Sequence, residues 1–272
     1  MSATAPHSLG VIGLGRMAQA LLLPLMASGL VPRGQVCAAV ASEASAQRLQ
    51  AAHPGLAVGT DAGPAWRCEA VLLAVKPQQL AAVAAAAPQP QSGGTGPLLI
   101  SVLAGVSLAR LQTLFPAWRV VRAVPNTPCL VRAGLTGLAW GDGVAAASQA
   151  WVRQLFAQVG EVLELPESQL DAFLALTSSG PAFVALVAEA MADGAVAAGL
   201  PRALAHQLAH RTLAGTAALL QEQALHPGQL KDMVSSPGGT TIAGLRQLER
   251  AGARSALIEA VIAAAERSRE LA

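Results

Sequence analysis

The sequence predicts an α/β protein in which a doubly wound parallel sheet is followed by an all-α C-terminal domain. Two observations lead to this prediction. In the first 163 residues, fully apolar runs alternate with helix-compatible segments, which is typical of a parallel sheet covered by helices on both faces. From residue 164 onward, apolar residues recur at the 3.6-residue period of a helix. We therefore place the expected domain boundary between residues 163 and 164.

The first apolar run ends in a glycine-rich turn. Residues 9–18 read LGVIGLGRMA, with Gly13, Gly15 and Ala18 at the spacing G-x-G-x-x-A before a helical pattern. The first glycine permits a tight turn, the second lets a pyrophosphate approach the backbone, and the alanine lets helix and strand pack closely. Amides at the positive end of the helix would hold that pyrophosphate. The cofactor-binding residues expected here are Gly13, Gly15, Arg16 and Met17.

Four further apolar runs follow, at residues 36–41, 70–75, 98–103 and 119–124. Three of them lead into the segments AVKPQ, SVLAG and VPNTP. Any one proline there could merely end a strand. Three such rigid, polar segments, each directly after a strand, favour a cofactor site, because ligands bind at the carboxyl ends of the strands. We therefore expect residues 1–163 to form a dinucleotide-binding Rossmann domain.

The end of the second run bears on which dinucleotide binds. It finishes at Ala41 and Ser42 with no acidic residue at its tip to hold a ribose 2′-hydroxyl, although Glu43 follows at once. Ser42, Ser45 and Arg48 could instead receive a 2′-phosphate. NADPH is therefore favoured, NADH remains possible, and Arg48 could equally be a solvated helix residue.

The second half reads as a set of apolar helices. Pro166 and Glu167 mark the entry, and the GLP sequence at 199–201 separates two long helical patterns. Helices so poor in charge are expected to pack against a second copy of the chain, giving a homodimer. Residues 164–272 are thus predicted to form a helical domain for substrate binding and dimerisation. The stretch at 87–97 reads as a surface loop.

Composition excludes several classes of partner and compartment. The 272 residues carry a net charge of +2 and only 12% charged residues, without a basic run, so nucleic acid is not expected. Hydrophobic residues reach 53%, but the apolar stretches are interrupted, and we expect no membrane-spanning helix. The N-terminal decapeptide lacks the pattern of a signal peptide, which predicts a cytoplasmic protein. The three cysteines have no CxxC spacing and are expected to be reduced packing residues.

The chain is poor in titratable groups suited to carbonyl reduction. It has no tyrosine, two lysines and five histidines. His206 and His210 share a helix face, but no carboxylate or cysteine motif accompanies them, so no metal site is predicted. Reduction of a carbonyl builds negative charge on oxygen and normally needs a nearby acid, whereas an imine can arrive already protonated. The scarcity of acids therefore favours imine chemistry.

The stretch SSPGGTT at 235–241 interrupts the helical half. Pro237 suits the first turn of a helix running from about residue 238 to 250, with the two preceding serines as caps. The doubled glycine leaves main-chain amides accessible at the positive end of that helix, where an anion is favoured. The two threonines add hydroxyl donors. This set of groups suits a small carboxylate, although an ordinary capped helix start would read similarly.

These motifs together resemble one enzyme family. The segment HPGQLKDMVSSPGGTTIAGL at 226–245 is similar to the signature of Δ1-pyrroline-5-carboxylate reductases. Supporting matches span almost the whole chain: VIGLGRMA, AVKPQ, SVLAGV, RAVPNTPCLVRAG, SSGPAF and EAMADGAVAAGLPR. The resemblance implies a Rossmann domain, a helical domain that dimerises by interlocking, often within a larger ring of dimers, and reduction of Δ1-pyrroline-5-carboxylate to L-proline by NADPH or NADH, the last step of proline biosynthesis.

The resemblance also implies roles for particular residues. Thr241 is the catalytic candidate, close to the ring nitrogen as a hydrogen-bonding partner or proton donor. The substrate-binding residues implied are Ser236, Gly238, Gly239, Thr240 and Thr241. The further cofactor-binding residues implied are Ala74, Val75, Lys76, Pro77 and Asn126, in addition to Ser42, which follows from the end of the second apolar run. Where the family commonly has an asparagine and a tyrosine, this chain has Arg16, which could reach a phosphate or crowd the loop, and Phe183, which lacks a hydroxyl.

Two other functions are compatible with the layout. A β-hydroxyacid dehydrogenase shares the arrangement of a Rossmann domain and a helical domain, but it needs a catalytic lysine in a glycine-rich context, and Lys231 lacks that context. A non-catalytic nucleotide-binding module could dock a partner through the apolar helices. A second anion site in the helical half argues against such a module.

Overall fold

The computed structural model describes residues 6–88 and 96–270, so most of the loop expected at 87–97 lies outside the described residues. Contacts divide the chain into two compact units: the first runs to Ser178 and includes the residues from Ala265 onward, and the second spans Ser179–Ala264. The boundary between residues 163 and 164 stays a prediction, because it was drawn from a change of sequence pattern rather than from contacts.

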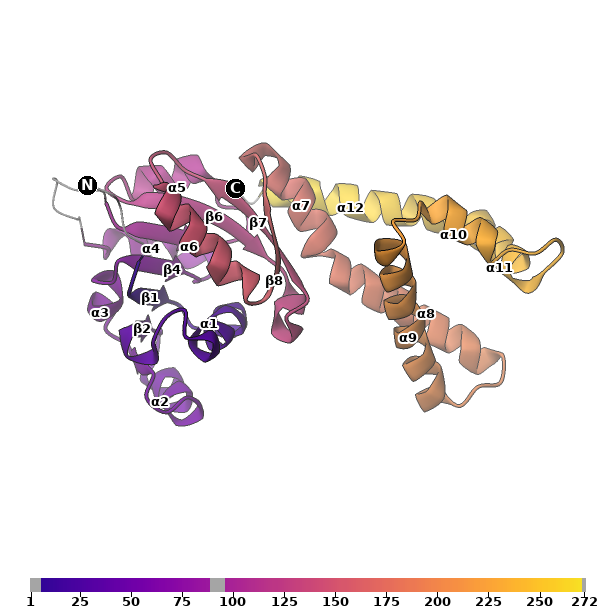
Figure 1. The fold of residues 1–272 in the computed structure, drawn as a ribbon, viewed down its shortest axis with the longest axis horizontal. Helices are drawn as coiled ribbons and strands as arrows, with labels where there is room; N and C mark the ends of the chain where they lie inside the picture. Colours follow the sequence, from indigo (N-terminus) through magenta and orange to yellow (C-terminus); the bar gives the residue numbers. More distant parts are fainter. Residues whose placement is uncertain (1–5, 89–95, 271–272) are drawn as a thin grey trace. The chain divides into compact units, whose positions relative to one another are not determined.

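The first unit contains one eight-stranded sheet (Figure 1). Its strands are β1 (Leu9–Ile12), β2 (Val36–Ala39), β3 (Ala57–Gly59), β4 (Ala70–Leu73), β5 (Leu98–Ser101), β6 (Arg119–Pro125), β7 (Gly134–Trp140) and β8 (Gly160–Glu164). They lie in the order β3-β2-β1-β4-β5-β6-β7-β8, with every neighbouring pair parallel except β6 and β7. The doubly wound fold is therefore confirmed, with an antiparallel pair and the strands β3, β7 and β8 as additions that the sequence had not indicated.

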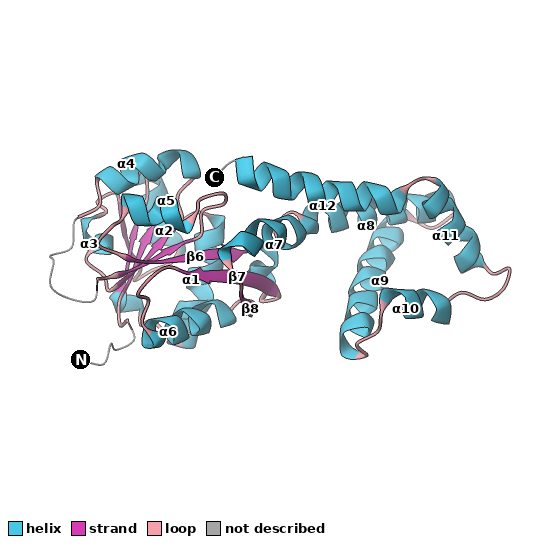
Figure 2. Ribbon diagram, turned by 90° about the horizontal axis from the view of Figure 1, so that it is seen from above, coloured by secondary structure: helices cyan, strands magenta, loops and turns pink. Residues whose placement is uncertain are grey.

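Helices cover both faces of this sheet (Figure 2). They are α1 (Arg16–Ser28), α2 (Glu43–Ala52), α3 (Gly63–Trp66), α4 (Leu80–Ala85), α5 (Leu108–Leu114), α6 (Ala146–Ala157) and α7 (Leu170–Thr177). One apolar cluster joins the sheet to α1, α2 and α6, and a second joins it to α3, α4, α5 and α7. The central strands β1, β4 and β5 are buried at every residue and are almost entirely apolar, as expected for strands covered on both faces, whereas β8 (GEVLE) is partly exposed.

A buried arginine ties three helices to the sheet. Arg122 on β6 is only 3% exposed, and its guanidinium lies 3.0 Å from Glu167 and 3.4 Å from Asp171. The amide of Leu108 donates to Glu167 at 2.6 Å, and the hydroxyl of Ser268 donates to Asp171 at 2.8 Å. Removing one partner of a fully buried pair typically costs about 3–5 kcal/mol, and the cost here is smaller because the side chains of Glu167 and Asp171 are partly exposed. These contacts therefore fix the start of α5, the start of α7 and the last turns of the C-terminal helix.

The second unit is helical, as predicted. Its helices are α8 (Gly180–Ala197), α9 (Arg202–Glu222), α10 (Pro227–Met233), α11 (Thr240–Arg250) and α12 (Ala253–Glu270), of which the last turns of α12 belong to the first unit. Small residues let α8 and α9 approach closely, at Ala192, Ala205 and Ala209. The turn between them contains Gly199 at φ 107°, a conformation that favours glycine.

The helical unit exposes many large apolar side chains, among them Val184, Leu186, Met233, Val234, Leu248 and Ile258. Within the described residues, one segment is long and apolar enough to cross a membrane, Glu167–Ala197, with a mean hydropathy of 1.6 and only 17% of its most apolar window buried. It is interrupted between α7 and α8, and Glu189 lies within α8. Exposed apolar surfaces of this extent are typical of an interface with another protein chain or with lipid.

The three cysteines are free, as expected, with Cys68 and Cys129 buried and Cys37 half-buried. Burial, together with the neighbouring Cys37, raises the pKa of the Cys68 thiol to about 11. Burial also raises the pKa of Cys129. Because the thiolate is the nucleophile, both buried thiols should be poorly reactive in the folded protein.

We expect a thiol reagent at pH 8 to leave Cys68 unmodified in the native protein, because a pKa near 11 keeps only about one thiol in a thousand ionised. Mass spectrometry after digestion locates the label, and labelling of all three cysteines in denaturant is the positive control. Rapid native labelling of Cys68 would contradict the buried position of this side chain.

Candidate nucleotide and substrate sites

The glycine-rich turn lies at the carboxyl end of β1, in the middle of the sheet. Gly13 has φ 88°, and its amide donates to the carbonyl of Ala39 at the end of β2. A Cβ on Gly13 would lie 2.8 Å from the carbonyl oxygen of Ala74. A Cβ on Gly15 would meet nothing within 4 Å. Gly13 is therefore required by the fold, whereas Gly15 leaves open space above the backbone.

Helix α1 begins in a form suited to an anion. Gly15 is its N-cap, no side chain caps the helix, and its first turn has no acidic residue. The first amides of a helix have no partner within it and carry the positive end of its dipole. Ala18 is 1% exposed and packs into the core, as the fingerprint requires. These features fit the pyrophosphate of a dinucleotide.

The next two fingerprint positions differ in exposure. Met17 is half-buried and packs against the core beneath α1. Arg16 is exposed and, with Arg132, lines a groove of about 490 Å³ along α1. Its backbone therefore belongs to the helix start, while its side chain borders that groove.

The segment after β4 lies beside this turn. The amide of Ala74 donates to the carbonyl of Ile12 at 2.8 Å, and Val75 would contact a side chain on Gly13. Lys76 is exposed, and Pro77 begins a short 3-10 turn. The structure thus brings together the residues predicted from the fingerprint and those predicted after β4.

Ser42 lies after β2, the other neighbour of β1. It is the N-cap of α2, where its side chain accepts from the amide of Ser45 at 3.3 Å and donates to the Ser45 hydroxyl at 3.0 Å. Arg48 follows on α2 and is exposed. The hydroxyls predicted to receive a 2′-phosphate therefore lie at the positive end of a helix, where an anion is favoured.

Asn126 follows β6 and is 4% exposed. Its side-chain oxygen accepts from the amide of Leu135 at 2.8 Å, and its side-chain nitrogen donates to the carbonyl of Thr177 at 2.9 Å. A contact of Asn126 with the cofactor stays a prediction. Its bond to the end of α7 could not be foreseen from the sequence, because 51 residues separate the two partners.

The SSPGGTT segment connects α10 and α11 in the helical unit. The predicted helix start was wrong by about two residues, since α11 begins at Thr240 with Gly239 as its N-cap. Pro237 and the two serines therefore lie before the helix and do not cap it, because Gly238 adopts φ 67° and turns the chain between them and α11. The amide of Gly239 donates a hydrogen bond to the carbonyl of Ser236 at 3.0 Å.

The start of α11 is open for a ligand. No side chain caps it, and its first turn has no acidic residue. The amides of its first three residues have no partner within the helix. Thr240 is exposed and Thr241 is half-buried. A Cβ on Gly239 would clash with the Ser236 hydroxyl, so a side chain at this position would force that hydroxyl to move. The five predicted substrate residues thus form one local cluster.

One buried hydroxyl in this segment was not singled out from the sequence. The oxygen of Ser235 is inaccessible to water and has no hydrogen-bond partner among the described residues. The sequence placed this serine only as a possible cap. A signal for its burial could not be read from the sequence, because it depends on how the loop folds over itself.

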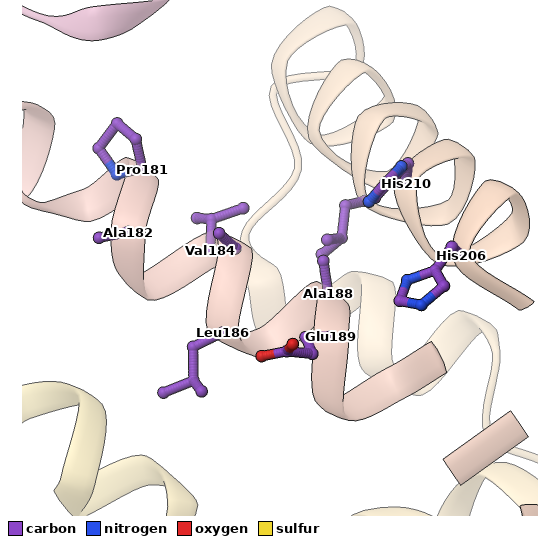
Figure 3. Close-up of a pocket in the computed structure, with 10 residues that line it drawn as sticks. Pro181, Ala182, Val184, Leu186, Ala188, Glu189, His206 and His210 are labelled. Carbon is purple, nitrogen blue, oxygen red and sulfur yellow. The ribbon is translucent and has the colours of Figure 1, made fainter. Parts of the chain in front are cut away.

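A separate groove of about 780 Å³ lies between α8 and α9 (Figure 3). Glu189 on α8 and His206 and His210 on α9 line it among mostly apolar side chains. The two imidazole rings are 6.3 Å apart. Phe183, where the family commonly has a tyrosine, is half-buried on α8.

Comparisons with known protein families cover both units. Residues 8–105 match the model of the NADP oxidoreductases described as coenzyme F420-dependent. Residues 167–271 match the model of the pyrroline-5-carboxylate reductase dimerisation domain. The second match includes the exposed apolar residues of the helical unit and the membrane-length segment, so another protein chain is an alternative cover to lipid.

Full-length relatives point the same way. The chain is 46% identical over 263 residues to a pyrroline-5-carboxylate reductase of Synechocystis sp., covering 97% of each protein. It is 39% identical over 262 residues to the pyrroline-5-carboxylate reductase of Arabidopsis thaliana, covering 96% of this chain and 94% of that protein. A crystal structure of a Plasmodium falciparum pyrroline carboxylate reductase with NADP bound has a TM-score of 0.87 at 28% identity, covering 99% of each chain.

Two glycine substitutions should separate folding from cofactor binding. We expect Gly15→Ala to leave the unfolding free energy within about 0.5 kcal/mol of the wild type, because its Cβ meets no atom, while weakening NADPH binding where the backbone must be approached. Gly13→Ala should lower both the unfolding free energy and the affinity for NADPH, because the φ of Gly13 is positive and a Cβ there would lie too close to Ala74. Denaturant unfolding and fluorescence titration with NADPH measure the two quantities. Unchanged NADPH affinity in Gly15→Ala would contradict the site.

Proposed function

The chain belongs to the pyrroline-5-carboxylate reductase family, and on that premise we propose that it reduces Δ1-pyrroline-5-carboxylate to L-proline with hydride from NADPH, the last step of proline biosynthesis. The single observation that carries this proposal is 46% identity to a reductase of that name along 97% of both chains. The matched region includes both helix starts described above, one in each unit.

The first unit is an NADP(H)-binding domain, and we propose which of its residues hold the cofactor. The helix-start amides and the open face of Gly15 support a pyrophosphate contact. Ala74, Val75, Lys76 and Pro77 border the nicotinamide, since they follow the strand adjacent to β1. Bound NADPH supplies the hydride. A preference for NADPH over NADH is proposed from Ser42, Ser45 and Arg48.

The start of α11 is proposed to hold the substrate carboxylate. Its uncapped amides follow Gly238 and Gly239, and the hydroxyls of Ser236, Thr240 and Thr241 lie in the same segment. A small carboxylate at this point is stabilised by the helix dipole and by charge-neutralising hydrogen bonds. Holding the acid group fixes the rest of a five-membered ring, because the ring is rigid and the carboxylate is attached directly to it.

The reaction adds a hydride to C5 and a proton to the ring nitrogen, so the C=N bond becomes a C–N single bond. Thr241 is proposed to face the ring nitrogen, as a hydrogen-bond partner or as the donor of that proton. A hydroxyl is a weak acid, but it suffices where the imine arrives protonated and needs only orientation. The chain's lack of tyrosine is compatible with this chemistry.

The alternative function is that of a β-hydroxyacid dehydrogenase, with Lys231 as the catalytic lysine. Lys231 is exposed in the last turn of α10, where a cation interacts favourably with the helix dipole. That position accounts for the residue without catalysis. If the Lys231→Met variant reduces the imine at a near-normal rate, Lys231 is not a catalytic residue and this alternative is excluded.

The helical unit carries the family's dimerisation domain, and a homodimer follows from that. We propose that the partner chain covers the exposed apolar side chains of α8, α9 and α11, and that dimers assemble into a larger ring. We also propose a cytoplasmic location, in keeping with three reduced cysteines. The functional boundary is proposed at residues 163/164, close to where the dimerisation match begins at 167.

Thr241→Ala should lower kcat/KM about 100-fold, because loss of one donor in an oxyanion-type site costs roughly 3 kcal/mol. Thr241→Ser keeps the hydroxyl and is the matched control, expected to stay close to wild type. The loss should shrink towards acidic pH, where more substrate arrives protonated. Steady-state kinetics with unchanged turnover and substrate affinity in Thr241→Ala would remove the assigned role.

Arg48→Ala should raise the KM for NADPH about tenfold, since a charged hydrogen bond to a phosphate contributes roughly 1.5 kcal/mol or more. The KM for NADH, which has no 2′-phosphate, is the internal control and should not change. No effect on either cofactor would show that Arg48 is a solvated helix residue, and an equal effect on both would show that it does not act through the 2′-phosphate.

A further inference from the structure

We propose that Asn126 is a positioning residue: it fastens the end of α7 to the cofactor edge of the sheet, and hydride transfer depends on that attachment. The proposal rests on the proposed function. It assigns Asn126 a role distinct from the cofactor contact that the sequence predicted.

The hydrogen bonds of Asn126 define what its side chain does. The amide of Leu135 on β7 can only donate, and the carbonyl of Thr177 on α7 can only accept. The side-chain oxygen of Asn126 therefore faces Leu135, and its nitrogen faces Thr177, at 2.8 and 2.9 Å. With the residue 4% exposed, water cannot readily replace either partner.

The same strand holds α7 at both ends. Arg122 on β6 pairs with Asp171 in the first turn of α7, and Asn126 follows that strand four residues later and bonds Thr177 in the last turn. The hydroxyl of Ser178 adds a weak contact of 3.5 Å to the carbonyl of Pro125. A shift of α7 along β6 would therefore break a part-buried hydrogen bond at the start of the helix and a buried one at its end.

The attachment point has a functional consequence because of where it lies in the chain. Asn126 is at the carboxyl edge, where parallel strands present ligands. Thr177 and Ser178 end the first of the two segments that make up the first unit, and Ser179 begins the unit that contains the proposed carboxylate site. The chain thus leaves the nucleotide domain from a point fixed to the cofactor edge. Small misplacements of reacting groups reduce rates steeply.

Two substitutions test the attachment. Asn126→Ala removes both bonds, and we expect kcat with pyrroline-5-carboxylate to fall between about 10-fold and about 100-fold, while the Kd of NADPH stays within about twofold. Asn126→Asp keeps the acceptor for Leu135 but sets a charged oxygen against the Thr177 carbonyl. A protonated carboxyl would donate to that carbonyl again. The kcat of Asn126→Asp, divided by that of wild type at the same pH, should therefore rise as pH falls.

Trp140→Phe is the matched control. It removes one hydrogen bond, from the indole of Trp140 to Glu164 at 2.8 Å, at the opposite end of β7 from Asn126. It should lower stability without changing kcat or the Kd of NADPH. Loss of kcat in this variant as large as in Asn126→Ala would show a general effect of destabilisation and overturn the proposal.

Other outcomes are equally decisive. A raised Kd for NADPH with unchanged kcat in Asn126→Ala would make Asn126 a cofactor contact and overturn the proposal. Unchanged values of both kcat and this Kd would show that hydride transfer does not depend on the bond to Thr177, and would overturn it too. If Asn126→Ala does not fold, a pH-independent ratio for Asn126→Asp overturns the proposal on its own. Absence of imine reduction by the wild-type protein would instead refute the proposed function, so the two failures are distinguishable.

Discussion

The arrangement depends on keeping the amides at two helix starts free of side-chain caps. Gly15 before α1 and Gly239 before α11 have nearly the same extended conformation, with φ −75° and ψ −173° in one and φ −78° and ψ 175° in the other. Neither helix has an acidic residue in its first turn. A serine cap, as at α2, would stabilise each helix by only a few tenths of a kcal/mol relative to glycine, and it would occupy the amides that an anion needs. Stability is thus given up at both helices where a ligand is proposed.

The stability of the first unit depends on the burial of apolar side chains and on a few buried hydrogen bonds and ion pairs rather than on surface charge. Two apolar clusters enclose the sheet, and a fully buried leucine contributes about 1.5–3 kcal/mol. Within this core, Arg122 and Asn126 hold the two ends of α7 to β6. Because leaving a buried polar group unpaired costs free energy, these hydrogen bonds restrict the position of α7 on the sheet.

The helical unit follows a different rule. Its large side chains, such as Leu186 and Met233, are more than half exposed. The match to the family's dimerisation domain explains this surface without invoking lipid. The mean hydropathy of +0.47 for the whole chain therefore has two sources, the buried core of the sheet and the exposed apolar side chains of the helical unit.

The sequence by itself determined the doubly wound sheet, the helical second half and the positions of the two glycine-rich segments, because periodicity and glycine spacing are local properties. It also determined the family, through motifs spread over the chain. It missed β3, β7 and β8, because these strands are short or of mixed composition and show no clear hydrophobic period. It placed the start of α11 too early, because the positive φ of Gly238 cannot be read from the sequence. Only the tertiary structure decided that Asn126 meets Thr177 and that Arg122 meets Asp171, since hydrogen bonds between distant segments depend on strand order and helix packing, which no local pattern encodes.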